Sequence, residues 1–177
     1  MGKQILISDK LELTRYKQTI YDNLQKSLEN IKFVLNNNDS TFVFESFKYD
    51  KIVIDPLTGN HENLIEMVNQ YQTYLVTLKA LEFLFEKYSD KSFIARFGNI
   101  AGYDIESTDG EIIAECFAQV SYKNNKKLDK DLEKLSSITC ETIRYEFFYD
   151  RAFNTDNYIA YKTKYPEINI IKFETLK

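Results

Sequence analysis

The stretch GYDIESTDGEIIAECFAQVSYKNNKKL, residues 102–128, decides how the chain is interpreted. A Thr-Asp-Gly turn at 108–110 separates a short run at 103–107 from a mostly apolar run at 111–121, which predicts two antiparallel strands over these ranges. The lysine-rich end of the stretch then opens an amphipathic helix at 124–135. The pattern therefore predicts a hairpin followed at once by a helix.

Two acids stand on this hairpin. Asp104 opens its first strand, and Glu115 lies in the middle of its second strand among apolar residues. Alternate residues of a strand share one face of a sheet, so Phe117 points the same way as Glu115 while Cys116 points the opposite way. A buried carboxylate needs a partner, a metal or a proton. A regular hairpin brings both acids to one end of the sheet and makes them the first candidates for chemistry.

The rest of the chain predicts an α/β fold with a mixed sheet flanked by helices. Leucine, isoleucine and aromatic residues recur every three or four positions in two long helices. The predicted helices are 11–36 and 61–88, and the further predicted strands are 41–47, 51–56, 92–98, 142–150 and 167–174. Residues 151–165 fit a short helix or a loop. We expect a single domain over 1–177, with 1–60 as a helical and hairpin extension packed on a core formed by 61–177.

Composition excludes several classes of function. The net charge of −4 and pI of about 5.2 argue against binding nucleic acid through basic tails, although a local basic groove is compatible with them. Cys116 and Cys140 form no metal-binding motif and favour a reducing cytoplasm, and His61 is the single histidine. No apolar run is long enough to predict a membrane helix. Chemistry must therefore come from carboxylates, lysines, tyrosines or a metal.

The order helix, strand, strand, strand, helix, strand over 61–150, with Asp104 and Glu115 in the second and third strands, resembles the PD-(D/E)XK nuclease superfamily. The resemblance implies a restriction-endonuclease-like αβββαβ core. It also implies that the two acids are catalytic and bind Mg²⁺ or Mn²⁺. In that superfamily a lysine two residues after the second acid helps to position or activate the attacking water. Phe117 occupies that position here, and Tyr103 precedes the first acid in place of the proline of the motif's name.

Three interpretations of Phe117 remain open. In the first, the site is catalytically inactive and the fold binds nucleic acid or a protein. In the second, the chain is a Mg²⁺-dependent DNA endonuclease whose cation has migrated to the start of the following helix, at Lys123, Lys126 or Lys127. In the third, the pattern is accidental and the chain is an unrelated α/β interaction domain.

Cationic residues near the hairpin and in the later strand are candidates for contact with double-stranded DNA. They are Lys123, Lys126, Lys127, Arg144 and Arg151. The lysines also fit an ordinary amphipathic helix with charge pairs one turn apart, such as Lys127 with Asp131. The tyrosines around the two arginines fit a protein partner equally well, and the long apolar helices offer surface for a homodimer.

Overall fold

The computed structural model describes residues 2–98, 100–119, 126–150 and 155–176. Contacts within the chain divide it into two compact units. We call Met1–Lys10 with Gln72–Lys177 the sheet unit, and Leu11–Tyr71 the helical unit. Helix α3 (Leu64–Lys87) starts in the helical unit and continues in the sheet unit.

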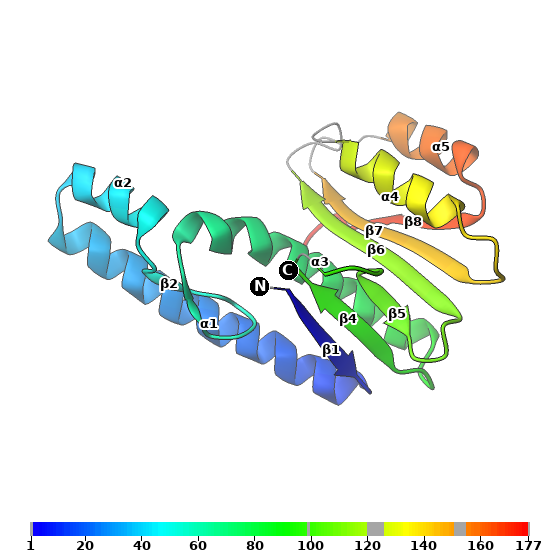
Figure 1. Ribbon diagram of the computed structural model, residues 1–177, viewed down its shortest axis with the longest axis horizontal. Coiled ribbons are helices and arrows are strands. Elements are labelled where there is room, and N and C mark those ends of the chain that lie inside the picture. The colour runs from blue at the N-terminus through cyan, green and yellow to red at the C-terminus, as the bar shows by residue number, and fades with distance from the viewer. Residues whose placement is uncertain (1, 99, 120–125, 151–154, 177) are drawn as a thin grey trace. The chain divides into compact units, whose positions relative to one another are not determined.

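The sheet unit is built on one mixed sheet of six strands in the order β1-β4-β5-β6-β7-β8 (Figure 1). The first four strands of this order pair antiparallel, whereas β6, β7 and β8 run parallel. The strands are β1 (Lys3–Ile7), β4 (Phe93–Phe97), β5 (Ile105–Ser107), β6 (Ile112–Gln119), β7 (Ile143–Asp150) and β8 (Ile168–Lys172). The predicted α/β class, a mixed sheet flanked by helices, is confirmed.

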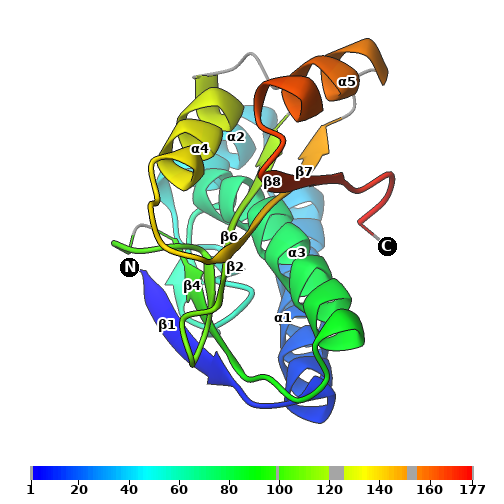
Figure 2. The same cartoon turned by 90° about the vertical axis from the view of Figure 1, so that its right-hand side faces the viewer.

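Helices cover both faces of this sheet, as Figure 2 shows. One face packs on α3 through aromatic rings: Phe85 lies 5.1 Å from Phe93, and Phe83 lies 5.9 Å from Tyr145, centroid to centroid. The other face is covered by α4 (Lys127–Ser136) and α5 (Thr155–Lys164). Because successive strand residues alternate between the faces, each buried strand must be apolar on both sides.

The face under α4 has a compact apolar core. Three leucines of α4 pack on strand residues of β6, β7 and β8 with Tyr165. The members are Ile113, Phe117, Leu128, Leu132, Leu135, Phe148, Tyr165, Ile168 and Ile170. The leucines recur at three- and four-residue steps and therefore form one stripe of the helix. This packing fixes the position of α4 over the sheet and so determines which of its polar side chains reach the strands.

Two parts of the sheet unit were not specified by the sequence patterns. Residues 3–7 form β1, which pairs with β4 at the edge of the sheet. The segment 151–165, which fits a helix or a loop, contains α5. The helix after the hairpin begins at Lys127 rather than at 124.

The helical unit corrects the predicted N-terminal hairpin. Residues 41–47 are not a strand but lie in α2 (Ser40–Tyr49), which follows α1 (Lys10–Asn37). Asp39 caps α2 by accepting hydrogen bonds from the backbone N–H groups of Thr41 and Phe42, at 2.9 and 3.1 Å. The burial of Val43 and Ser46 has the three-residue spacing of a helix, so the aromatic composition that favours a strand is overridden.

Only two residues of the predicted strand 51–56 form a strand, β2 (Val53–Ile54), and its partner is β3 (His61–Glu62). Asp55 shapes the turn between them, because its carboxylate accepts hydrogen bonds from the backbone N–H groups of Leu57 and Thr58. In the part of the chain that the structure describes, no helix combines the length and apolar character needed to cross a membrane.

Candidate functional site

Asp104 and Glu115 come together as the hairpin predicts. The register of β5 with β6 pairs Ile105 with Ala114, and its continuation by one residue places Asp104 opposite Glu115. At this point the Asp104 side chain bonds the backbone of β6: its Oδ2 accepts a hydrogen bond of 2.8 Å from the backbone N–H of Cys116. This hydrogen bond holds the Asp104 carboxylate at the start of β5, beside the carboxylate of Glu115.

Phe117 lies on the same face as Glu115, as strand parity predicts. It is 3% exposed and stacks on Phe148, with ring centroids 5.4 Å apart and planes at 12°. Leu128 and Leu132 of α4 belong to the same cluster. The position that carries a lysine in the resembling superfamily is therefore part of the apolar core.

A lysine reaches Glu115 from α4 instead. The Nζ of Lys134 forms an ion pair with Glu115 Oε1 and donates a hydrogen bond of 2.6 Å to the carbonyl of Gly102. It also lies 4.8 Å from the centre of the Tyr103 ring. The Glu115 side chain is 4% exposed while that of Lys134 is 43% exposed, so the lysine links a buried carboxylate to the surface.

Gly102 is required for this arrangement. Its φ of +121° is a conformation that residues with a Cβ rarely adopt. A Cβ at this position would also lie 3.0 Å from the guanidinium of Arg96, which itself bonds the carbonyl of Tyr103. The loop before β5 can therefore present its carbonyl to Lys134 only with glycine at position 102.

Two further acids lie near the first pair. Glu146 is the partner of Glu115 in the parallel register of β6 and β7 and is fully buried. Asp131 of α4 is 4% exposed, and its Oδ1 accepts a 2.7 Å bond from Lys127. Neither acid was predicted as a site residue from the sequence, although the ion pair of Lys127 with Asp131 was, and this pair is confirmed.

The electrostatics of the cluster are dominated by burial. Burial raises the pKa of Glu115 to about 7, with the negative charge of Asp104 adding to the shift and Lys134 opposing it. Burial, together with Asp131 and Glu115, raises the pKa of Glu146 well above its usual range. Burial also raises the pKa of Asp131, against the attraction of Lys127. Glu115, Asp131 and Glu146 therefore hold protons more tightly than exposed carboxyls do.

This shift predicts a pH dependence of stability. A carboxyl whose pKa is about 7 in the folded chain and 4.5 when unfolded binds its proton more tightly in the fold. Its contribution to the free energy of unfolding is then complete below pH 4.5 and is lost as the pH rises toward 7. We expect Glu115→Gln to remove on the order of 3 kcal/mol of this decline. Urea denaturation without metal, at several pH values, measures it; parallel pH curves for the two proteins would contradict it.

The lysines and arginines that the sequence predicts as catalytic or DNA-binding residues lie in different surroundings. Lys126 precedes α4 with a positive φ of 51° and is exposed, while Lys127 pairs with Asp131. Burial lowers the pKa of Lys127, but the attraction and hydrogen bond of Asp131, with the charges of Asp104 and Glu115, together outweigh burial and raise it. Arg144 donates to the carbonyls of Ile138 and Cys140 and so braces the loop before β7. Lys123 and Arg151 lie outside the described residues.

The carboxylates of the cluster have the chemistry of metal ligands, but few of them are grouped. Within the described ranges, no three acidic, histidine or cysteine side chains form a ready-made metal site. Mg²⁺ is commonly held by one or two protein carboxylates, with waters and phosphate oxygens completing its shell. Asp104 and Glu115 supply that number of hard oxygen ligands at neighbouring strands, and Asp131 has a buried oxygen that finds no hydrogen-bond partner among the residues the structure describes. The residues present therefore fit a divalent cation.

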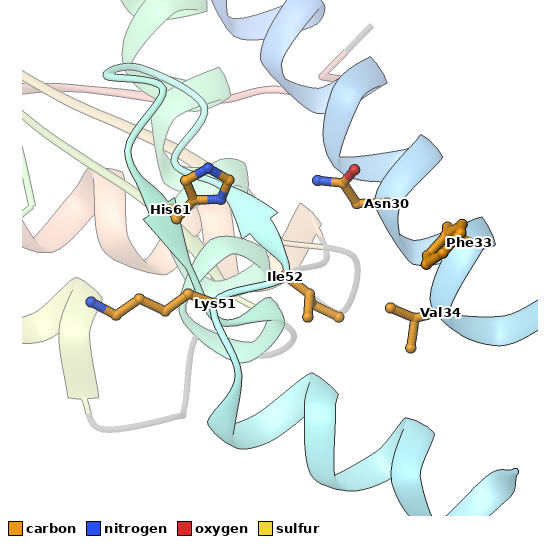
Figure 3. A pocket seen from close by; sticks show the side chains of 6 residues that line it. All are labelled: Asn30, Phe33, Val34, Lys51, Ile52 and His61. Atoms are coloured by element: carbon orange, nitrogen blue, oxygen red, sulfur yellow. The ribbon is translucent and has the colours of Figure 1, made fainter. Parts of the chain in front are cut away.

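The helical unit has a separate pocket of about 230 Å³. Figure 3 shows Lys51, Ile52 and His61 on one side and Asn30, Phe33 and Val34 of α1 on the other. Lys51 and His61 are exposed, and Val34 is buried. The single histidine of the chain thus lines an open pocket with a partly apolar wall.

The chain was compared with models of protein families, with curated proteins and with solved structures, and none of them matched. Its function is therefore argued from the geometry of the carboxylate cluster.

Proposed function

We propose that the sheet unit is a metal-dependent nuclease of the PD-(D/E)XK type that acts on double-stranded DNA. Lys134 takes the place of the lysine that this superfamily carries two residues after its second acid. The observation that carries the proposal is the ion pair of Lys134 with Glu115, on the sheet face that Phe117 shares. The order of α3, β4, β5, β6, α4 and β7 supports it, because it is the order of the superfamily's core.

Each residue has a role that its surroundings support. Asp104 and Glu115 would hold Mg²⁺ or Mn²⁺, which supplies charge stabilisation for the phosphoryl oxygens and lowers the pKa of a bound water. Lys134 orients the buried carboxylate of Glu115 and presents a partly exposed ammonium to a phosphate. Phe117 and its leucine neighbours keep water out of the layer beneath. The catalytic lysine thus comes from the helix that covers the sheet.

A second function is favoured by two features of the site. Phe117 is buried in the core, and the ammonium of Lys134 is already engaged by Glu115 and the carbonyl of Gly102. A chain that has lost cleavage and binds nucleic acid or a protein partner would tolerate both features. The two functions can be distinguished by experiment, because only the nuclease requires DNA cleavage that depends on a metal.

The test is cleavage of linear and supercoiled double-stranded DNA by the full chain with Mg²⁺ or Mn²⁺. We expect cleavage that disappears in Asp104→Asn and in Glu115→Gln. Glu106→Gln is the matched control, since Glu106 lies on β5 and is paired with Arg96 at 3.0 Å. The control should cleave at the wild-type rate. No cleavage by the wild type, or equal cleavage by the Asp104 and Glu115 variants, would refute the nuclease and leave the binding module.

A further inference from the structure

The pocket of the helical unit contains no residue of the carboxylate cluster and has no part in the proposed nuclease. Its volume is about 230 Å³, and its walls come from α1 and from the chain that enters and forms the β2–β3 hairpin (Figure 3). A cavity of about 150 Å³ is enough to hold a benzene ring. The pocket therefore has room for one aromatic ring that carries a small polar group.

One face of α1 supports the hairpin and also forms a wall of the pocket. Ser27 and Asn23 on this face are buried: Ser27 Oγ accepts the backbone N–H of Ile54 at 2.9 Å, and Asn23 Nδ2 donates 3.1 Å to a carbonyl of the turn after β2. Asn30 and Val34 follow on the same face at steps of three and four residues, and both line the pocket. The buried hydrogen bonds thus hold the two walls together before a ligand binds.

Three polar side chains of the pocket are free to bind a ligand. Among the residues that the structure describes, the amide of Asn30, the ammonium of Lys51 and the imidazole of His61 make no hydrogen bond or ion pair. The six lining residues include this lysine and no carboxylate. The lining therefore offers one positive charge and further N–H donors, which together suit an anionic group.

The remaining lining residues are apolar. The ring of Phe33 is 68% exposed, and it lies with Val34 and Ile52 around the same space. A flat ring bound there would remove this apolar surface from water.

We propose that this pocket binds a small aromatic carboxylate of about the size of benzoate. The ring packs on Phe33, Val34 and Ile52. The carboxylate is bound by Lys51 and His61, which lie across the pocket from α1 (Figure 3). The proposal depends on neither a metal nor DNA cleavage.

The experiment is an NMR titration of the full chain with benzoate at constant pH. His61 is the single histidine, so its imidazole proton signals report on the pocket without overlap from other histidines. We expect these signals to shift to saturation and to give one dissociation constant. Benzamide, an uncharged analogue of the same shape, should bind at least about threefold more weakly. Benzoate that causes no saturable shift, or benzamide that binds as tightly, would overturn the proposal.

Two variants test the two halves of the pocket separately. Lys51→Met removes the cation and Phe33→Ala removes the exposed ring, and each should lower the affinity for benzoate by about three- to tenfold. Both side chains are exposed, so the fold should persist, and far-ultraviolet circular dichroism checks this. Wild-type affinity in either variant would overturn the proposal.

Lys32→Met is the matched control for the loss of one positive charge. Lys32 is an exposed residue of α1 two positions before Val34, and so lies about 200° around the helix from that lining residue. This variant should bind benzoate as the wild type does. A loss of affinity equal to that of Lys51→Met would show that benzoate responds only to the overall charge of the chain, and would overturn the assigned site.

Discussion

Phe117→Lys, which places a lysine two residues after Glu115 as in the PD-(D/E)XK motif, is expected to destabilise the fold rather than to create or improve the proposed cleavage. The side chain at 117 is enclosed by Phe148, Leu128 and Leu132. Loss of a buried phenylalanine costs about 3–5 kcal/mol, and an ammonium among leucines adds a desolvation cost. Folded domains are stable by only about 5–15 kcal/mol, so we expect a largely unfolded protein or a strongly lowered urea midpoint.

Urea denaturation followed by far-ultraviolet circular dichroism measures this effect, since the chain has no tryptophan to report on the core. Phe117→Leu is the control, because it keeps an apolar side chain of similar reach and should cost far less. A Phe117→Lys protein as stable as the wild type would contradict the prediction. It would show that Glu115, two residues away on the same face, accepts the new ammonium without repacking.

Lys134→Met is expected to lower the rate of DNA cleavage by roughly 10²–10³-fold, the usual effect of removing one group that stabilises charge at a reaction centre. Methionine keeps an unbranched stem beside Tyr103, so packing changes little while the ion pair with Glu115 is lost. The loss also leaves Glu115 as a buried carboxylate without its cation, and its pKa should rise further. Single-turnover cleavage at saturating enzyme measures the rate, and urea denaturation shows that the variant is folded.

Lys130→Met is the matched control, since Lys130 is an exposed residue of the same helix. It should cleave at the wild-type rate. Lys127→Met separates the two candidate lysines. If Lys127→Met loses cleavage and Lys134→Met does not, the moved cation is at the start of α4, as the sequence analysis expected, and the role given to Lys134 is wrong.

Lys134 was not predicted from the sequence as the partner of Glu115, and the reason is geometric. The lysines nearest in sequence to Glu115 are at the start of α4, and they were chosen for that proximity. Helix α4 joins two parallel strands, so it runs back along β6. Seven helical residues return the chain by about 10 Å, which is the length of about three strand residues. A lysine two turns into the helix therefore lies over the middle of β6, where Glu115 is. The seven-residue spacing of Lys127 and Lys134 was the available signal.

Glu146 was missed because the sequence TIRYEFFYD gives it an ordinary place in an amphipathic strand. Alternation predicts that Tyr145 and Phe147 share one face and Glu146 and Phe148 the other, but both faces of β7 are buried. Burial on both sides depends on α3 and α4, which lie far from this strand in sequence. The predicted strand at 41–47 failed in a related way, since its buried residues, Val43 and Ser46, have the three-residue spacing of a helix while Phe42 and Phe44 are exposed.

The sequence by itself determined the hairpin, the convergence of Asp104 and Glu115 and the common face of Glu115 and Phe117, because these follow from the two-residue period of a strand. It also predicted the mixed sheet and its flanking helices. Only the tertiary structure decided which lysine meets Glu115 and that Glu146 is buried without a hydrogen-bond partner among the described residues. Both depend on the direction in which α4 crosses the sheet and on the packing of its leucines, and these long-range contacts are not specified by the period of any one strand or helix.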